Sequence, residues 1–92
     1  MKYQIERTTQ FKRDYKLAKK RGCNLDLLWQ VIRLLADGEK LPPEYHDHFL
    51  VGEYSGYKEC HIKPDWLLIY LIEKDMLILT LVNTGSHADL FR

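Results

Sequence analysis

The sequence predicts an α+β fold in which an antiparallel helix hairpin packs on one face of a small antiparallel sheet. Apolar residues recur at helical spacing over residues 11–36, whereas residues 57–82 show the alternating and continuous apolar runs of strands. Glycine and proline residues separate the two parts. The chain has 92 residues, the size of one small domain, so we expect a single domain over residues 1–92.

The beginning of the chain predicts a strand followed by a helix. Residues 2–7 alternate weakly between polar and apolar side chains and indicate a short strand. Either Thr8 or Thr9 can cap the helix that follows. Gly22 is expected to end this helix, because glycine readily adopts the left-handed backbone found there.

A second helix is predicted between Asn24, a good N-cap, and Gly38. Its apolar residues form one wide stripe: Leu25, Leu28, Trp29, Ile32, Leu35 and Ala36. Few residues separate the two helices, so they should form an antiparallel hairpin. The prolines of Leu41-Pro42-Pro43 prevent further helix.

The second half of the chain predicts antiparallel strands. Residues 57–63 alternate in polarity, and residues 66–72 are apolar on both faces, as in a central strand. Residues 73–75 are polar and predict a hairpin turn, from which residues 76–82 return. We expect residues 83–85 to form a loop.

The end of the chain predicts one helical turn. Ser86 can cap it, and Asp89 stands at the reciprocal capping position three residues later.

The net charge of +1 hides an uneven distribution. Residues 1–33 hold nine basic and three acidic residues, a net +6, and residues 34–92 hold five basic and ten acidic residues, a net −5. The basic part could contact a phosphate backbone or could be a solvated helix face. Its cluster on the first helix comprises Lys12, Arg13, Lys16, Lys19, Lys20 and Arg21.

The composition favours a cytosolic protein. The longest apolar run, residues 66–72, is far too short to span a bilayer, and the N-terminus lacks the apolar segment of a signal peptide. Cys23 and Cys60 have no metal-binding or redox spacing and are expected to be reduced thiols.

The chain has four histidines, and three of them, together with one aspartate, are the candidate catalytic residues. His48 is expected in a loop, His61 on the polar face of a strand and His87 at the start of the last turn, with Asp65 in a turn after His61. Imidazoles can move protons near neutral pH, which suits RNA cleavage by the 2′-hydroxyl. His46 is our candidate for a plain surface residue.

The sequence spacing of these residues does not by itself distinguish catalysis from other roles. Three histidines and an aspartate could bind zinc, although none are paired closely in sequence, or could simply lie on the surface. Trp66 and Phe91 could stack on unpaired bases or pack in the core.

One long motif resembles a known family. The pattern DHxL…G…GYxxxHIxPDWLLIY…TGSHxxLF occupies residues 47–50, 52, 56–70 and 84–91. It is similar to the YafQ-like mRNA interferase toxins of the RelE/ParE superfamily, and it covers about half of the chain. The resemblance implies a RelE-like fold and the toxin of a type II toxin–antitoxin module.

The resemblance also implies an activity and partners. Such toxins enter the ribosomal A site, next to 16S rRNA, and cut the mRNA there without metal or cofactor, leaving a 2′,3′-cyclic phosphate. A cognate antitoxin blocks the toxin, and the complex reaches operator DNA only through the antitoxin. The basic first helix would then contact ribosomal RNA.

The resemblance implies a role for each residue of this chain that matches a functional position of the family. His48 and His61 match base or orienting groups, and His87 and Asp65 match the acid or leaving-group partners. Trp66 and Phe91 match positions implicated in substrate placement.

One position departs from the family, which commonly has an arginine where this chain has Asn83. Loss of a cationic contact to the scissile phosphate typically costs about 2–4 kcal/mol of transition-state stabilisation. Lys63, Lys58 or Arg92 could compensate. Otherwise the chain would be an attenuated toxin, a ParE-like binder that occludes a target without catalysis, or a co-repressor with its antitoxin.

Overall fold

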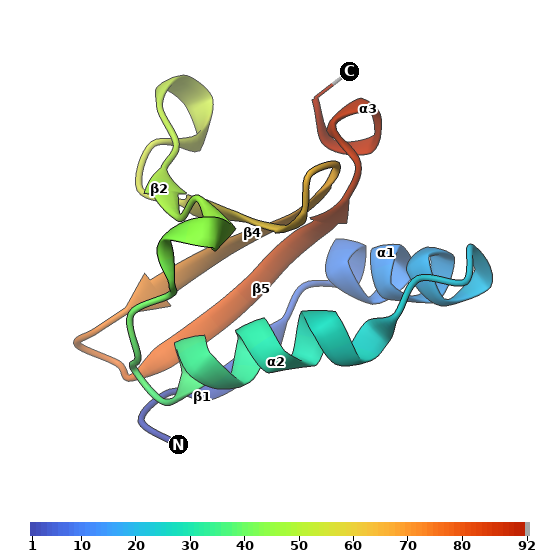
Figure 1. Ribbon diagram of the computed structural model, residues 1–92. Helices are drawn as coiled ribbons and strands as arrows, with labels where there is room; N and C mark the ends of the chain where they lie inside the picture. The colour runs from blue at the N-terminus through green and yellow to red at the C-terminus, as the bar shows by residue number, and fades with distance from the viewer. Residues whose placement is uncertain (92) are drawn as a thin grey trace.

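The computed structural model describes residues 1–91 and has a five-stranded sheet with two helices on one face (Figure 1). The strands are β1 (Gln4–Arg7), β2 (His48–Phe49), β3 (Lys58–Lys63), β4 (Trp66–Glu73) and β5 (Ile78–Gly85). The helices are α1 (Thr9–Lys20), α2 (Leu25–Ala36) and the single turn α3 (His87–Leu90). The α+β class with a helix hairpin and a C-terminal turn is therefore confirmed.

The sheet is mixed, whereas the sequence predicted an antiparallel one. Its order is β1-β5-β4-β3-β2, and β1 runs parallel to β5 while the other neighbours are antiparallel. The helix hairpin returns the chain to the start of β1, where the N–H of Tyr3 donates to the carbonyl of Ala36 at 2.8 Å. The later hairpins then bring β5 alongside β1 in the same direction, a pairing that apolar periodicity alone does not specify.

The predicted helix ends are confirmed. The Thr8 hydroxyl accepts from the Phe11 N–H at 2.9 Å and donates to the Val82 carbonyl at 2.6 Å, so it caps α1 and joins it to β5. Asn24 caps α2, and Gly22 follows α1 with φ +80°.

The core lies between α2 and the sheet. Leu28, Ile32 and Leu35 of α2 are buried against the inner strands, as predicted. Trp29 packs at the margin of this core and is only partly buried, with its indole N–H donating to the Tyr15 hydroxyl at 3.0 Å. Cys60 is buried within the core.

Residues 83–85 belong to β5 rather than to the predicted loop. The Thr84 hydroxyl accepts from the Trp66 indole at 3.0 Å and donates to the Leu67 carbonyl at 2.7 Å. Asp14 of α1 accepts from the Thr84 N–H at 3.1 Å. These tertiary contacts hold the strand beyond the point where apolar alternation ends.

The edge strand β2 and the turn α3 complete the fold. His48 lies in the two-residue edge strand β2, not in a loop, and pairs with Glu59. Ser86 and Asp89 form the predicted capping box of α3. Among residues 1–91, no helix has the length and apolar character needed to cross a membrane.

Candidate active site

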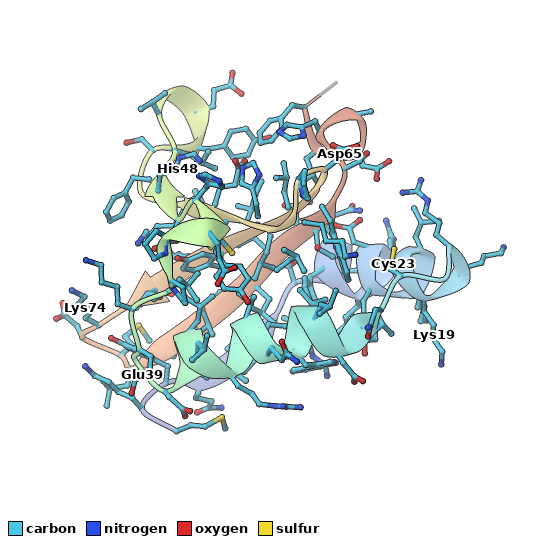
Figure 2. The ribbon with its side chains drawn as sticks, in the orientation of Figure 1. Lys19, Cys23, Glu39, His48, Asp65 and Lys74 are labelled. Carbon is cyan, nitrogen blue, oxygen red and sulfur yellow. The ribbon has the colours of Figure 1, made fainter. Side chains whose placement is uncertain are left out.

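Three of the four predicted catalytic side chains are imidazoles that gather on the sheet face opposite the helices. His48 comes from β2, His61 from β3 and His87 from the start of α3. Cys60 and Ile62 point into the core, so the pleat turns His61 to the other face. Figure 2 shows His48 and Asp65 on the side away from α2. The ring centroids of His61 and His87 are 5.8 Å apart, which brings the C-terminal turn next to the central strands.

Asp65 orients His87. The Asp65 carboxylate accepts from the backbone N–H of His87 at 3.0 Å and lies 2.7 Å from Nδ1 of the ring. These hydrogen bonds lower the pKa of Asp65, the backbone one most. A carboxylate acceptor requires the proton on Nδ1, which leaves Nε2 as the nitrogen for a substrate.

Glu59 was not among the predicted site residues, yet it lies between two of them. Its Oε1 is 3.3 Å from Nε2 of His48 and 3.6 Å from Nε2 of His61. Glu59 is only 5% exposed. The alternation of residues 57–63 had already predicted that Glu59 and His61 share one face of the strand. The alternation did not predict that Glu59 is buried. The three ligand atoms lie within 4.8 Å of one another and could hold a metal ion.

His46, expected to be a plain surface residue, belongs to the histidine cluster. Its ring centroid is 5.5 Å from that of His61. It follows the 3₁₀ turn Pro43–Tyr45 and has a left-handed backbone with φ 48°. A cleft beside it is lined by His61 and Lys63 as well, which places a cationic side chain near the imidazoles.

Asp47 is a second carboxylate that the sequence did not single out. It accepts from the buried hydroxyl of Tyr70 and from Nζ of Lys58 at 2.7 Å. Burial, more than the hydrogen bond to Asp47, raises the pKa of the Tyr70 hydroxyl, so Tyr70 remains a donor. Asp47 therefore fastens the segment between His46 and His48 to the sheet.

The two candidate stacking residues differ. Trp66 is 8% exposed and packs against the core, which favours the packing alternative over stacking on a base. Phe91 is 40% exposed and meets Tyr54 edge to face, with centroids 6.2 Å apart. Tyr54 had not been predicted as a site residue.

The position that departs from the family lies on the site face at the edge of β5. Asn83 pairs in register with Ile69, which pairs with Glu59. Its amide is 3.5 Å from the Asp14 carboxylate. Lys58, one candidate for compensation, is engaged by Asp47, whereas Lys63 is exposed beside His61. Arg92, the other candidate, lies outside the described residues.

The basic cluster lies on the exposed surface of α1. All six of its members are exposed, and five of them lie within α1, namely Lys12, Arg13, Lys16, Lys19 and Lys20. The sixth, Arg21, donates to Asp89 of α3 at 2.7 Å and thereby ties α1 to the turn that carries His87. Arg21 thus has an intramolecular partner in addition to its predicted contact with ribosomal RNA.

Neither cysteine takes part in the histidine cluster. Both are free thiols, as expected, and Cys23 lies half-buried after α1. Burial raises the pKa of the Cys60 thiol, which keeps it protonated and unreactive.

Comparison with known proteins relates this arrangement to one group of toxins. Residues 3–92 match the family described as the bacterial toxin of the type II toxin–antitoxin system, YafQ. The mRNA interferase toxin YafQ of Escherichia coli K12 is 40% identical over 88 residues, covering 95% of this chain and 94% of the relative.

Solved structures agree. The E. coli DinJ–YafQ complex matches with a TM-score of 0.90 and 38% identity, over 98% of this chain and 99% of the matched chain. A metal-bound toxin from Helicobacter pylori matches with a TM-score of 0.91 and 44% identity, over 97% and 99%.

Proposed function

Because the chain belongs to the YafQ family of bacterial toxins of type II toxin–antitoxin systems, we propose that it is an mRNA interferase that cleaves mRNA in the ribosomal A site. The E. coli relative is named an mRNA interferase, and a structure holds that relative in complex with DinJ. The single observation that carries the proposal is the convergence of His48, His61 and the Asp65–His87 pair on one sheet face.

The reaction we propose is cleavage by the neighbouring 2′-hydroxyl. His61 or His48 removes the 2′-OH proton, and the 2′-oxygen bonds to phosphorus. The bond from phosphorus to the 5′-oxygen breaks, and His87 protonates that oxygen, which leaves a 2′,3′-cyclic phosphate. The Asp65 carboxylate supports the acid role, because it stabilises a protonated His87 ring at 2.7 Å.

Substrate placement is assigned to exposed groups around the imidazoles. Lys63 is suited to contact the scissile phosphate, and the exposed ring of Phe91 can stack on a base. The route itself requires no metal or cofactor, since two positioned proton-transfer groups suffice. The metal-bound state of the Helicobacter pylori relative does not conflict with it, because a bound ion need not take part in cleavage.

The partners follow from the same proposal. The exposed lysines of α1 would contact 16S rRNA, whose phosphates attract a cationic helix face. A cognate antitoxin would block the site, and operator DNA would be reached only through that antitoxin. Action on ribosomes places the toxin in the cytoplasm.

The test is cleavage of mRNA on purified ribosomes, with 5′ ends mapped by primer extension. Wild type should cut at the A-site codon, and His87→Ala should lose the cuts while keeping its circular dichroism spectrum. Omitting ribosomes should abolish cleavage. Cuts that persist in His87→Ala, or that need no ribosome, would reject the proposal.

A second candidate function is binding without efficient catalysis, and Asn83 favours it. Its neutral amide near Asp14 offers the phosphate no positive charge. If wild type does not cut but Asn83→Arg does, the chain is an attenuated toxin. If neither cuts although an antitoxin still binds, occlusion of a target or co-repression replaces the nuclease.

A further inference from the structure

Tyr54 and Phe91 form an exposed aromatic pair from two segments that lie far apart in the chain. Their ring centroids are 6.2 Å apart and their planes meet at 87°, an edge-to-face contact. Tyr54 belongs to the 3₁₀ turn Gly52–Tyr54 after β2, and Phe91 directly follows α3. Figure 1 shows the segment after β2 and the turn α3 on the side of the sheet away from α2. Two rings thus meet on the side of the molecule that carries the histidines.

Both rings keep accessible surface although they touch each other. Tyr54 and Phe91 are each 40% exposed, whereas Trp66, which packs against the core, is 8% exposed. An edge-to-face pair does not stack its two ring faces on each other, so aromatic surface remains for a further flat ring. Every nucleobase has an aromatic face that can stack in this way. The pair therefore suits an unpaired RNA base.

Backbone hydrogen bonds hold both rings in place before any substrate binds. The N–H of Phe91 donates to the carbonyl of His87 at 2.9 Å. The N–H of Tyr57 donates to the carbonyl of Tyr54 at 3.0 Å, where the segment enters β3. Gly56, between these two tyrosines, has a φ of +97° that other residues rarely adopt. A prearranged pair loses less conformational entropy when it binds a base.

The place of the pair indicates which base it would hold. In the proposed reaction His87 protonates the leaving 5′-oxygen, which belongs to the nucleotide on the 3′ side of the cut. Phe91 lies one helical turn after His87. The groups assigned to the 2′-hydroxyl of the other nucleotide, His48 and His61, come instead from β2 and β3. The base next to the pair is therefore that of the 3′ nucleotide.

We propose that Tyr54 and Phe91 form a stacking site for the unpaired base on the 3′ side of the scissile phosphate. The inference rests on the proposed function, and it adds Tyr54 to the residues that place the substrate. Stacking is tolerant of sequence, so the site accepts purines and pyrimidines. Holding this base keeps the leaving 5′-oxygen within reach of the His87 ring, which raises the rate by positioning.

The first test compares variants in the ribosome assay with toxin below saturation. Tyr54→Ala should cut mRNA about 5- to 150-fold more slowly than wild type, as expected from the loss of one base–aromatic contact. Tyr54→Trp keeps a stacking surface and should restore most of the rate. Val51→Ala is the matched control, because it truncates an apolar side chain that is 86% exposed beside the same turn and has no aromatic face.

Circular dichroism checks that each variant is folded. A folded Tyr54→Ala that cuts as fast as wild type would overturn the site, as would a folded Tyr54→Trp that cuts as slowly as Tyr54→Ala.

The second test identifies the base. An abasic nucleotide, which keeps its phosphates but has no ring to stack, replaces the nucleotide on the 3′ side of the mapped cut. Wild type should then lose about the factor that Tyr54→Ala loses on normal mRNA, and Tyr54→Ala should lose nothing further, because both changes remove one contact. With the abasic nucleotide on the 5′ side, the two losses should multiply. Losses that multiply at both positions, or only at the 3′ position, would overturn the assignment.

The third test needs no cleavage and separates the stacking site from the proposed function. The fluorescent base 2-aminopurine is placed at each position of the A-site codon in turn, after a 2′-deoxy nucleotide that cannot be cut. Wild type bound to the ribosome should quench the fluorescence by stacking, and bound Tyr54→Ala should not. Cleavage of normal mRNA without quenching would overturn the stacking site alone. Quenching without cleavage would reject the nuclease and keep the stacking site, and a protein that does neither would overturn both.

Discussion

At the scale of single residues, the site depends on carboxylates that hold the histidines rather than on the histidines alone. Asp65 fixes the ring of His87, and Glu59 lies between His48 and His61. Asp47 acts at a greater distance, because it fastens the backbone between His46 and His48 to the sheet through Tyr70 and Lys58. Asp65 and Glu59 thus lie beside imidazole rings, whereas Asp47 supports the backbone that carries two of the histidines.

Asp47→Ala should destabilise the protein by about 2 kcal/mol, since it leaves the buried Tyr70 hydroxyl without its acceptor and Lys58 without its counter-ion. Urea unfolding followed by tryptophan fluorescence measures the change. Asp75→Ala, in the exposed β4–β5 turn, is the matched control and should leave the midpoint unchanged. Equal midpoints for the two variants would show that Asp47 does not anchor the segment.

Sequence alone predicted the catalytic candidates but not their supports. The family motif identified His48, His61, Asp65 and His87, and the structure brings all four to one face. Glu59 was missed because alternation predicts its strand face but not its burial, and because its pairing with His48 in β2 was not predicted. Trp66 was left open because periodicity does not reveal the Thr84 hydroxyl that receives its indole N–H inside the core.

At the scale of elements, α1 is joined to the sheet through its N-cap residue. The Thr8 hydroxyl caps the helix and also donates to the carbonyl of Val82 in β5. Thr8→Ala should therefore lower the free energy of unfolding by about 1–2 kcal/mol. Chemical unfolding measures it, and exposed Thr9→Ala is the control. A larger loss in Thr9→Ala would place the cap one residue later than the structure does.

The turn that carries His87 is joined to α1 by the Arg21–Asp89 ion pair. The hydrogen bond from Arg21, followed by those of the capping box, lowers the pKa of Asp89. Because the pKa is lower in the folded state, the pair's stabilisation is complete above the ordinary aspartate pKa of about 4 and is lost as the pH falls below it.

Arg21→Gln should consequently lower the thermal midpoint at pH 7 and have less effect at pH 3, because at pH 3 Asp89 is largely protonated in the unfolded chain and part of the pair's stabilisation is already lost. Melting curves at the two pH values measure this difference. Arg13→Gln removes an exposed arginine of the same helix and should shift neither midpoint. An equal loss from Arg21→Gln at both pH values would mean that the ion pair is not the source of the stabilisation.

Elements whose apolar residues repeat with a clear period could be predicted from the sequence. Elements whose limits or pairing depend on tertiary contacts could not. The apolar stripes and caps identified both helices of the hairpin. The extension of β5 to Gly85 required Asp14 of α1 and the partner strand β4, both distant in sequence. The parallel pairing of β1 with β5 likewise results from the path of the helix hairpin, which periodicity does not encode.

At the scale of the whole molecule, much of the positive charge of residues 1–33 lies on the exposed surface of α1. The exposed lysines of α1 lie on one side of the molecule, and Figure 2 shows Lys19 far from Lys74 in the β4–β5 turn. Figure 2 shows the catalytic candidates His48 and Asp65 on the side of the molecule away from α2. A large nucleic acid that contacts α1 could therefore be held while a single strand reaches the imidazoles.

The triple variant Lys12→Gln, Lys16→Gln, Lys19→Gln should weaken binding to ribosomes and reduce its salt dependence. Each phosphate contact that is lost should lower the slope of log affinity against log salt by about one unit. Co-sedimentation with ribosomes over a series of salt concentrations measures both quantities. Lys74→Gln removes a positive charge from the distant turn and should leave the slope unchanged. Because none of these lysines contacts the histidine cluster, the purified triple variant should keep wild-type stability. If the triple variant binds with the wild-type slope, the +6 of residues 1–33 is a solvated helix face, and the ribosome is held by another surface.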